Sequence, residues 1–192
     1  MLYSILLIRD QHTKEVLSKT CDHQPFIAKA PLVMVFLADV QRWYDYYRIS
    51  NVEEYCRRTG MEYREPNLSD LFISVSDALI AAQNVVIAAE SLGIGSCYIG
   101  DVMENYETHR ELLGLPEYAF PIAMLCLGYY PDDHKPIVRP RFDQQYFVFE
   151  EKYHRLNAEE LTAMFAELEA SIPRPNKYAA ENAAQYTFAR KT

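Results

Sequence analysis

The chain lacks the compact motifs that usually reveal an enzyme's chemistry. It contains no GxSxG segment, no phosphate-binding P-loop and no GxGxxG segment, and its five histidines stand apart from one another. Gly93-Ile94-Gly95 does not replace the last motif, because it follows a helical pattern, whereas a dinucleotide motif follows a strand and opens a helix. We therefore expect surface histidines, and neither a hydrolytic triad nor a Rossmann fingerprint.

Cysteine pairs and an excess of basic charge are also missing. Cys21, Cys56, Cys97 and Cys126 form no CxxC pair and no Cys/His cluster with zinc spacing, which predicts no metal site and a reducing, cytoplasmic setting. Cys97 and Cys126 fall in apolar strand patterns, where cysteine is usually a small buried hydrophobe. With 27 Asp+Glu against 19 Lys+Arg, the chain is not expected to bind nucleic acid or an anionic membrane surface. No apolar run reaches the length of a membrane span, and residues 1–8 lack the features of a signal peptide.

The longest helical pattern covers residues 74–92. Apolar or small residues recur along it at the spacing of one helix face, and the other side is nearly as apolar, so the helix is expected to be buried all round. Gly93 is expected to end the helix in a left-handed conformation. Residues 96–99 then form a short strand, and Gly100 and Asp101 begin a new element, a helix with Glu104 completing a capping box.

Strands and helices alternate along the remaining chain. Further strands are expected at residues 2–8, 32–37, 122–127 and 146–150, with helices at residues 10–19 and 157–170. Residues 27–31 are expected to lead into the second strand. The continuous apolar run at residues 2–8 predicts a strand buried on both faces. The alternation indicates an α/β or α+β sheet with helices on its faces.

Residues 41–67 form a segment rich in tyrosine and charge, here called the excursion. It is predicted to be an amphipathic helical insertion rather than a second domain. Its aromatic residues either pack on the body of the protein or form a lid over a planar ligand. Residues 172–192 have little core character and are expected to form an arm across another surface or a frayed tail.

Arg139-Pro140-Arg141 is the best candidate anion site. Proline fixes the backbone between two guanidinium groups, which can form charge-assisted hydrogen bonds to a phosphate. A solvent-exposed basic loop is the competing interpretation.

Taken together, four segments resemble the FMN-dependent nitroreductase/flavin reductase family, closest to its oxygen-insensitive branch. They are HQPFIAKAPLVMVFLADV (23–40), DALIAAQNVVIAAESLGIGSCYIGDV (77–102), LLGLPEYAFPIAMLCLGYYPDDHKP (112–136) and VRPRF (138–142). The resemblance runs in consistent order over residues 2–156. It implies an α+β, three-layer fold with a mainly antiparallel central sheet flanked by helices. Residues 1–171 would form the FMN-binding domain, with 41–67 as a lid-like excursion, and residues 172–192 a C-terminal arm exchanged in a homodimer.

The resemblance also implies a set of cofactor-binding residues and no catalytic residue from the protein, since the chemistry takes place on FMN. Ser4 would lie near the flavin, and Gln24 would hydrogen-bond it. The flavin-side turn would comprise Tyr98, Ile99 and Gly100, and Asp101 stands where many family members have a second glycine. The FMN phosphate would be bound by Arg139 and Arg141.

The function implied is ping-pong hydride transfer from NADPH or NADH to a small-molecule acceptor, namely a nitroaromatic compound, a quinone or a flavin. The family's N-terminal Arg-x-Ser-x-Arg helix has no counterpart in these residues, so FMN is expected to be held by fewer contacts. Two alternatives are a flavin-binding carrier or sensor without turnover, and an N-terminally truncated scaffold with weak or no FMN binding.

Overall fold

The computed structural model describes residues 1–135 and 141–171. It divides into two units, Met1–Asp133 and His134–Thr192. The predicted C-terminal arm, residues 172–192, lies outside the described residues, so the boundary expected at 171/172 stays a prediction.

The first unit is built on a four-stranded antiparallel sheet with the order β1-β2-β4-β3. The strands are β1 (Tyr3–Ile8), β2 (Leu32–Asp39), β3 (Gly95–Ile99) and β4 (Ala119–Gly128). This confirms the α+β class. The expectation that the first strand is buried on both faces is wrong, because β1 is an edge strand and Leu7 is exposed. The central positions belong to β2 and β4, whose apolar runs are almost continuously buried.

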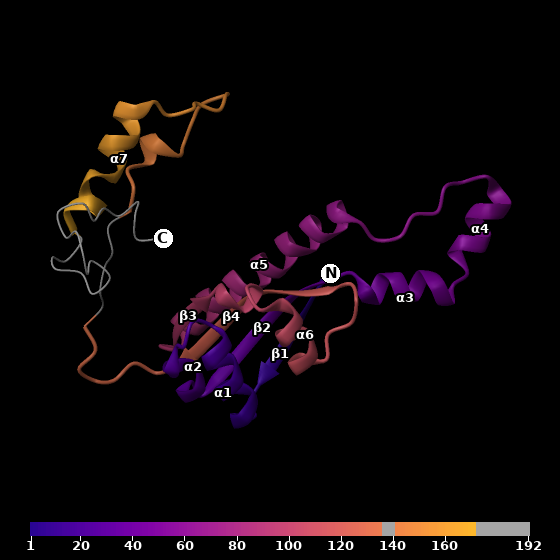
Figure 1. The fold of residues 1–192 in the computed structure, drawn as a ribbon, viewed down its shortest axis with the longest axis horizontal. Helices are drawn as coiled ribbons and strands as arrows, with labels where there is room; N and C mark the ends of the chain where they lie inside the picture. The colour runs from indigo at the N-terminus through magenta and orange to yellow at the C-terminus, as the bar shows by residue number, and fades with distance from the viewer. Residues whose placement is uncertain (136–140, 172–192) are drawn as a thin grey trace, which may run out of the picture. The chain divides into compact units, whose positions relative to one another are not determined.

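Helices cover both faces of this sheet and give three layers (Figure 1). On one face lie α1 (Gln11–Thr20), α2 (Pro25–Lys29), the 3-10 turn η1 (Asp101–Met103) and α6 (Tyr106–Leu113); on the other lies α5 (Leu68–Ser91). Because side chains alternate along a strand, Met124 and Cys126 pack toward α1, whereas Leu125 and Leu127 pack toward α5.

Both ends of α5 are fixed by local hydrogen bonds. Asn67 and Asp70 form a capping box, so the helix begins six residues before the predicted start at residue 74. At the other end Gly93 has φ +70°, and the N–H groups of Gly93 and Ile94 donate to carbonyls of the last turn. The left-handed glycine predicted there is confirmed.

Within a single chain this helix is buried on one side only and not, as predicted, on all sides. Its buried residues are small and share the face against the sheet: Ser74, Ala78, Ala82 and Ala89. Larger apolar side chains, among them Leu79, Ile80 and Ile87, are exposed. Within the described residues, α5 is also the one helix that is long and apolar enough to cross a membrane, although no such run was expected from the sequence. Core helices of soluble proteins pass the same test of length and composition.

One local prediction on the α1 face of the sheet, a helix that begins at Asp101, is also wrong. The segment that leads into β2 contains the short helix α2, because Pro25 at its first turn suits a helix start and needs no N–H partner. Asp101 opens only the single turn η1, and the following helix, α6, begins after Asn105.

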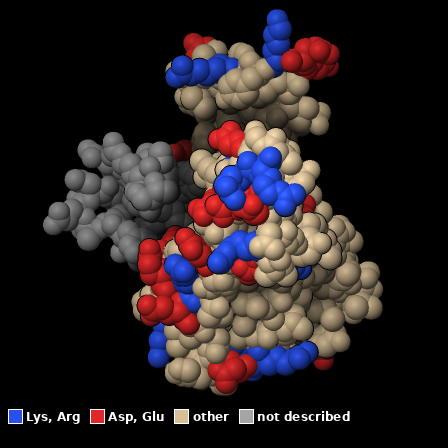
Figure 2. All heavy atoms as spheres, turned by 90° about the vertical axis from the view of Figure 1, so that its right-hand side faces the viewer, with Lys and Arg blue, Asp and Glu red and all other residues tan. Residues whose placement is uncertain are grey.

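The excursion contains α3 (Gln41–Ile49) and α4 (Val52–Thr59), which confirms the predicted helical insertion. It projects beyond the sheet (Figure 1). Near its base Tyr44 packs edge-on against Tyr118, with ring centroids 4.8 Å apart. Figure 2 faces the far end, where acidic and basic side chains lie side by side, as in the ion pair between Arg57 and Glu54.

The second unit contains the 3-10 turn η2 (Gln144–Tyr146) and α7 (Ala158–Ser171). The strand predicted at residues 146–150 is wrong, since the Asp143 carboxylate accepts from the Gln145 N–H and fixes a tight turn there. The predicted helix start is confirmed: Asn157 and Glu160 form reciprocal side-chain to backbone hydrogen bonds.

Candidate flavin-binding turn

The turn after β3 has an accessible backbone at Gly100, next to the side chains of Tyr98 and Ile99, which contact the rest of the protein. Ile99 is buried in the core with Val102, which fixes the turn from below. Gly100 is exposed with φ −83°, and a Cβ atom placed there would meet nothing within 4 Å. Tyr98 points to the other face of the sheet, where its hydroxyl lies 3.5 Å from Gln83 Oε1 on α5. Partial burial raises the pKa of the Tyr98 phenol.

Gln24 joins the turn from a distant part of the sequence. It is the N-cap residue of α2, and its Nε2 donates to the Cys21 carbonyl (3.0 Å) and to Asp101 Oδ2 (2.7 Å). Both amide protons are therefore engaged, while the side-chain oxygen has no hydrogen bond within the described part of the chain. Gln24 and the segment 98–101, which the resemblance both places at the flavin, are thus adjacent.

His109 supports the turn and was missed by the sequence prediction, which placed all histidines on the surface. It is fully buried on α6, with Nδ1 2.7 Å from the Val102 carbonyl and Nε2 2.7 Å from Thr20 Oγ1. The imidazole therefore links η1 to α1. The spacing was informative, because Leu112 and Leu113 lie three and four residues further along the same helix face.

Ser4 lies elsewhere and is already engaged. Its hydroxyl donates to the carboxylate of Asp39 and accepts from the Arg42 guanidinium, which also contacts Asp39 Oδ2 at 3.1 Å. Asp39 is 9% exposed, and its Oδ1 has no partner among the described residues. Because β1 and β3 are the two edge strands, Ser4 lies roughly 14 Å across the sheet from the turn. A single chain does not bring Ser4 to Tyr98.

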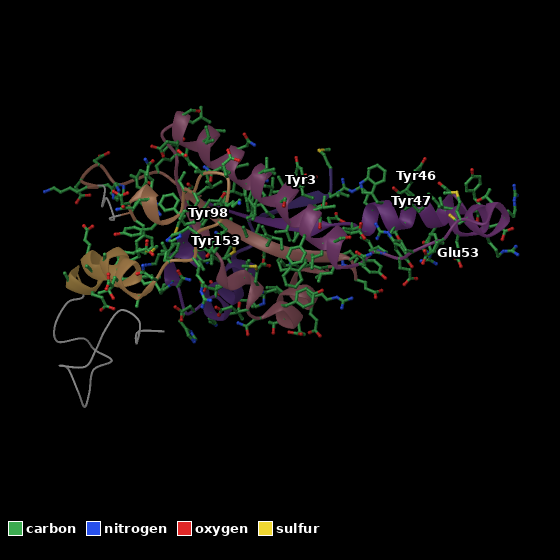
Figure 3. The ribbon with its side chains drawn as sticks, turned by 90° about the horizontal axis from the view of Figure 1, so that it is seen from above. Tyr3, Tyr46, Tyr47, Glu53, Tyr98 and Tyr153 are labelled. Atoms are coloured by element: carbon green, nitrogen blue, oxygen red, sulfur yellow. The ribbon has the colours of Figure 1, made fainter. Side chains whose placement is uncertain are left out.

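The aromatic residues of the excursion do not cover the turn in a single chain either. Tyr46 and Tyr47 lie on α3, well away along the molecule from Tyr98 (Figure 3). Both side chains are exposed. The lid interpretation therefore finds no support within one copy.

The predicted phosphate residues fall around the start of the second unit. Arg139 lies outside the described residues. Arg141 is exposed and lines a hollow of about 320 Å³ between η2 and α7, together with Asp143 and Glu167. Across the described ranges, no group of three or more His, Cys, Asp or Glu side chains is arranged to hold a metal ion.

Comparison with known proteins decides the family. The sequence profile of the nitroreductase family matches residues 4–129, which contain the whole sheet except its first residue. The chain belongs to the nitroreductase family. The match spans Ser4, Gln24 and the turn 98–101, and it ends before Arg139 and Arg141.

Relatives of this nitroreductase-family chain share both sequence and fold. An NADPH-dependent oxidoreductase from Staphylococcus aureus is 30% identical over 152 residues, which cover 79% of this chain and 57% of that protein. The NADPH:FMN oxidoreductase from Vibrio harveyi, solved in complex with NAD+, is 28% identical, with TM-score 0.73 over 88% of this chain and 67% of that one. Nitroreductase A from Vibrio parahaemolyticus is 29% identical, with TM-score 0.73 over 88% and 66%. The chain thus spans little more than half the length of its Staphylococcus relative.

Proposed function

We propose that the chain binds FMN at the turn 98–101 and acts as an NAD(P)H-dependent oxidoreductase. Its acceptors would be nitroaromatic compounds, quinones or flavins. The observation that carries the proposal is the hydrogen bond between Gln24 and Asp101, which holds two distant segments together beside the open backbone at Gly100. Membership of the nitroreductase family and the names of the oxidoreductase relatives support it.

The residues of the turn fit a flavin ring. Gly100 leaves the backbone accessible, since no side chain fills the space that its Cβ would occupy. The carbonyl oxygen of the Gln24 side chain can accept a proton from a ring N–H, because Asp101 and Cys21 hold the amide nitrogen. When bound, FMN would supply the hydride chemistry, and the protein would bind and orient it.

The phosphate of FMN is assigned to Arg139 and Arg141. Arginine suits this role because its planar fork of N–H donors matches phosphate oxygens. Arg141 is exposed and therefore accessible to a ligand.

We further propose that the protein is a homodimer whose seam includes α5. Exposed apolar residues recur along this helix at intervals of seven, a spacing typical of helix packing against helix: Phe72 and Leu79, and Ile73, Ile80 and Ile87. Ile80 is 62% exposed in the single chain. A partner copy would cover these residues and could bring its own Ser4 close to the flavin turn.

The proposal is tested by adding FMN to the purified protein and recording its absorbance and fluorescence before and after NADPH under anaerobic conditions. We expect FMN to bind, and NADPH to bleach the flavin bands. Binding without bleaching would identify a flavin carrier or sensor. A protein that stays colourless at high FMN concentration would refute the flavin site.

Two variants separate the phosphate site from general surface charge. Arg141→Ala is expected to weaken FMN binding by about tenfold to a hundredfold, because one charge-assisted hydrogen bond is worth about 1.5–3 kcal/mol. Arg155→Ala removes another exposed arginine of the same unit and is expected to leave affinity unchanged. Equal losses in both variants would contradict the assignment.

The dimer is tested by sedimentation of the wild-type protein and of Ile80→Glu. We expect a dimer for the first and a monomer for the second, because a charge cannot be buried in an apolar seam without a partner. A wild-type monomer would refute the seam.

A further inference from the structure

Cys97 and Cys126 lie directly opposite each other on neighbouring strands. In the antiparallel pair of β3 and β4, Cys97 is the register partner of Cys126. Directly opposed residues point to the same face of a sheet. That face is the one packed by α1 and α2, since Cys126 belongs to the core cluster with Leu17 and Ile27.

The opposed position suits a disulfide bond. Opposed Cα atoms in an antiparallel pair lie about 4.5–5.5 Å apart, which falls inside the range of about 4.4–6.8 Å found across disulfides. Both thiols are free in the structure. Forming the bond therefore requires mainly rotation of the two side chains, because the strands are already hydrogen-bonded to each other.

The two thiols differ in accessibility. The prediction that both are buried is wrong for Cys97, which is exposed because β3 is the edge strand. It lines an open hollow of about 360 Å³ with Phe26, Lys29 and Tyr130. Cys126 is buried beneath it, and burial, followed by the neighbouring Cys97, raises the pKa of the Cys126 thiol to about 12. Both residues line this hollow, but Cys97 is exposed, whereas Cys126 is only 6% exposed.

We infer that Cys97 and Cys126 are a peroxide-responsive thiol pair that closes to a reversible disulfide. Hydrogen peroxide transfers one oxygen atom to the Cys97 sulfur, which becomes a sulfenic acid, and the other oxygen leaves as water. The Cys126 sulfur then bonds to the Cys97 sulfur, while the hydroxyl group leaves with the Cys126 proton as a second water. Two thiols and one peroxide thus give one disulfide and two waters. A dithiol reductant returns the protein disulfide to two thiols by exchange and is itself oxidised to a disulfide.

The bond would act on the edge of the sheet that carries the proposed flavin turn. β3 is held by β4 on one side only. A covalent link at Cys97 fixes this strand one residue before Tyr98. The thiol pair itself does not depend on the proposed function, because its oxidation needs only peroxide and the two opposed side chains.

The test uses the full chain, reduced, freed of reductant and treated with one equivalent of hydrogen peroxide. Remaining thiols are alkylated after unfolding, and the digested protein is analysed by mass spectrometry. We expect a peptide pair linked through Cys97 and Cys126 with the mass of two hydrogens lost, restored to free thiols by dithiothreitol. Cys21 and Cys56 are expected to remain alkylated.

Variants assign the roles of the two sulfurs. Cys97→Ser changes an exposed residue, so it should fold, and Cys126 should then stay reduced under peroxide. Cys126→Ala should trap the sulfenic acid of Cys97, detected as a dimedone adduct. Cys56→Ser, on α4, is the matched control and should form the bond like the wild type. The inference is overturned if the wild type gives a Cys21–Cys126 link, a link between two chains through Cys97, or overoxidised Cys97 beside alkylated Cys126.

Discussion

Gln24 donates a hydrogen bond to the carboxylate of Asp101 over 2.7 Å, although 77 positions separate the two residues in sequence. The contact ties the start of α2 to the end of β3. Asp101 replaces a glycine that the family resemblance leads one to expect, and a glycine could not make this bond. The carboxylate thus sets the orientation of Gln24 beside the proposed flavin turn.

This contact predicts that two substitutions of Asp101 differ in their effect on FMN affinity. Asp101→Ala frees the Gln24 side chain and is expected to weaken FMN binding by about fivefold to tenfold, since one hydrogen bond contributes about 1 kcal/mol. Asp101→Asn keeps an acceptor at the same place and should bind FMN nearly as well as the wild type. Fluorescence titration measures both. Equal effects would show that the charge, and not the hydrogen bond, matters.

Two glycines form a matched pair for the location of the site. Gly100→Ala adds a methyl group into open space at φ −83°, so the free energy of unfolding should rise by about 0.4–1 kcal/mol, because alanine restricts the unfolded chain. If the flavin ring lies against this backbone, the methyl group should reduce FMN affinity by about tenfold or more. Gly93→Ala forces alanine to φ +70° and should destabilise the fold by about 1 kcal/mol with FMN affinity preserved. Urea unfolding and FMN titration of both variants check this, and unchanged affinity in Gly100→Ala would contradict the proposed turn.

The buried imidazole of His109 is expected to be essential for stability. His109→Phe removes the partner that the buried Val102 carbonyl has at 2.7 Å, whereas the Thr20 hydroxyl keeps the Val16 carbonyl as its acceptor. We expect the free energy of unfolding to fall by about 1–3 kcal/mol, because that is the usual cost of one abandoned buried polar group. His12→Phe, on the exposed face of α1, is the control and should change stability by less than about 0.5 kcal/mol. A similar small effect in both variants would show that water replaces the imidazole.

Asp70 is expected to make the fold sensitive to acid. The Arg64 guanidinium, 2.5 Å away, and the Asn67 N–H together hold the pKa of this carboxyl below its usual value of 3.8. Because the folded pKa is lower than the unfolded one, the contribution is present above about pH 4 and is lost as the pH falls through the folded pKa. Below about pH 4, the free energy of unfolding should therefore fall more steeply with decreasing pH in the wild type than in Asp70→Asn. Arg64→Ala should flatten the same part of the profile, and identical profiles for all three proteins would contradict the assignment.

Local signals in the sequence predicted much of this fold. Gly93 predicted the end of α5, because glycine adopts the left-handed conformation that ends a helix more readily than other residues. Asn157 and Glu160 predicted the start of α7. The resemblance paired Gln24 with the turn 98–101, and the structure places them in contact.

The failures have physical causes beyond local sequence. Apolar runs do not reveal whether a strand lies at the centre or the edge of a sheet, so β1 was taken to be buried, and so was Cys97 on β3. The apolar pattern of α5 indicated burial, yet Leu79, Ile80 and Ile87 are exposed in a single chain, because periodicity does not reveal how many neighbours pack against a helix. Residues 146–150 have the composition of a strand, but Asp143 turns the chain just before them.

The pairing of β2 with β4 also determines how the chain reaches this structure. Leu32 lies opposite Leu127. Pairing of β2 with β4 therefore closes a large loop of chain that contains the excursion, α5 and β3. The entropy of closing a loop rises only with the logarithm of its length, so the excursion adds little to that cost. Contacts between residues so far apart in sequence nevertheless slow folding, whereas a long capped helix such as α5 forms locally and fast. We therefore expect α5 to gain structure early and the two central strands to set the folding rate.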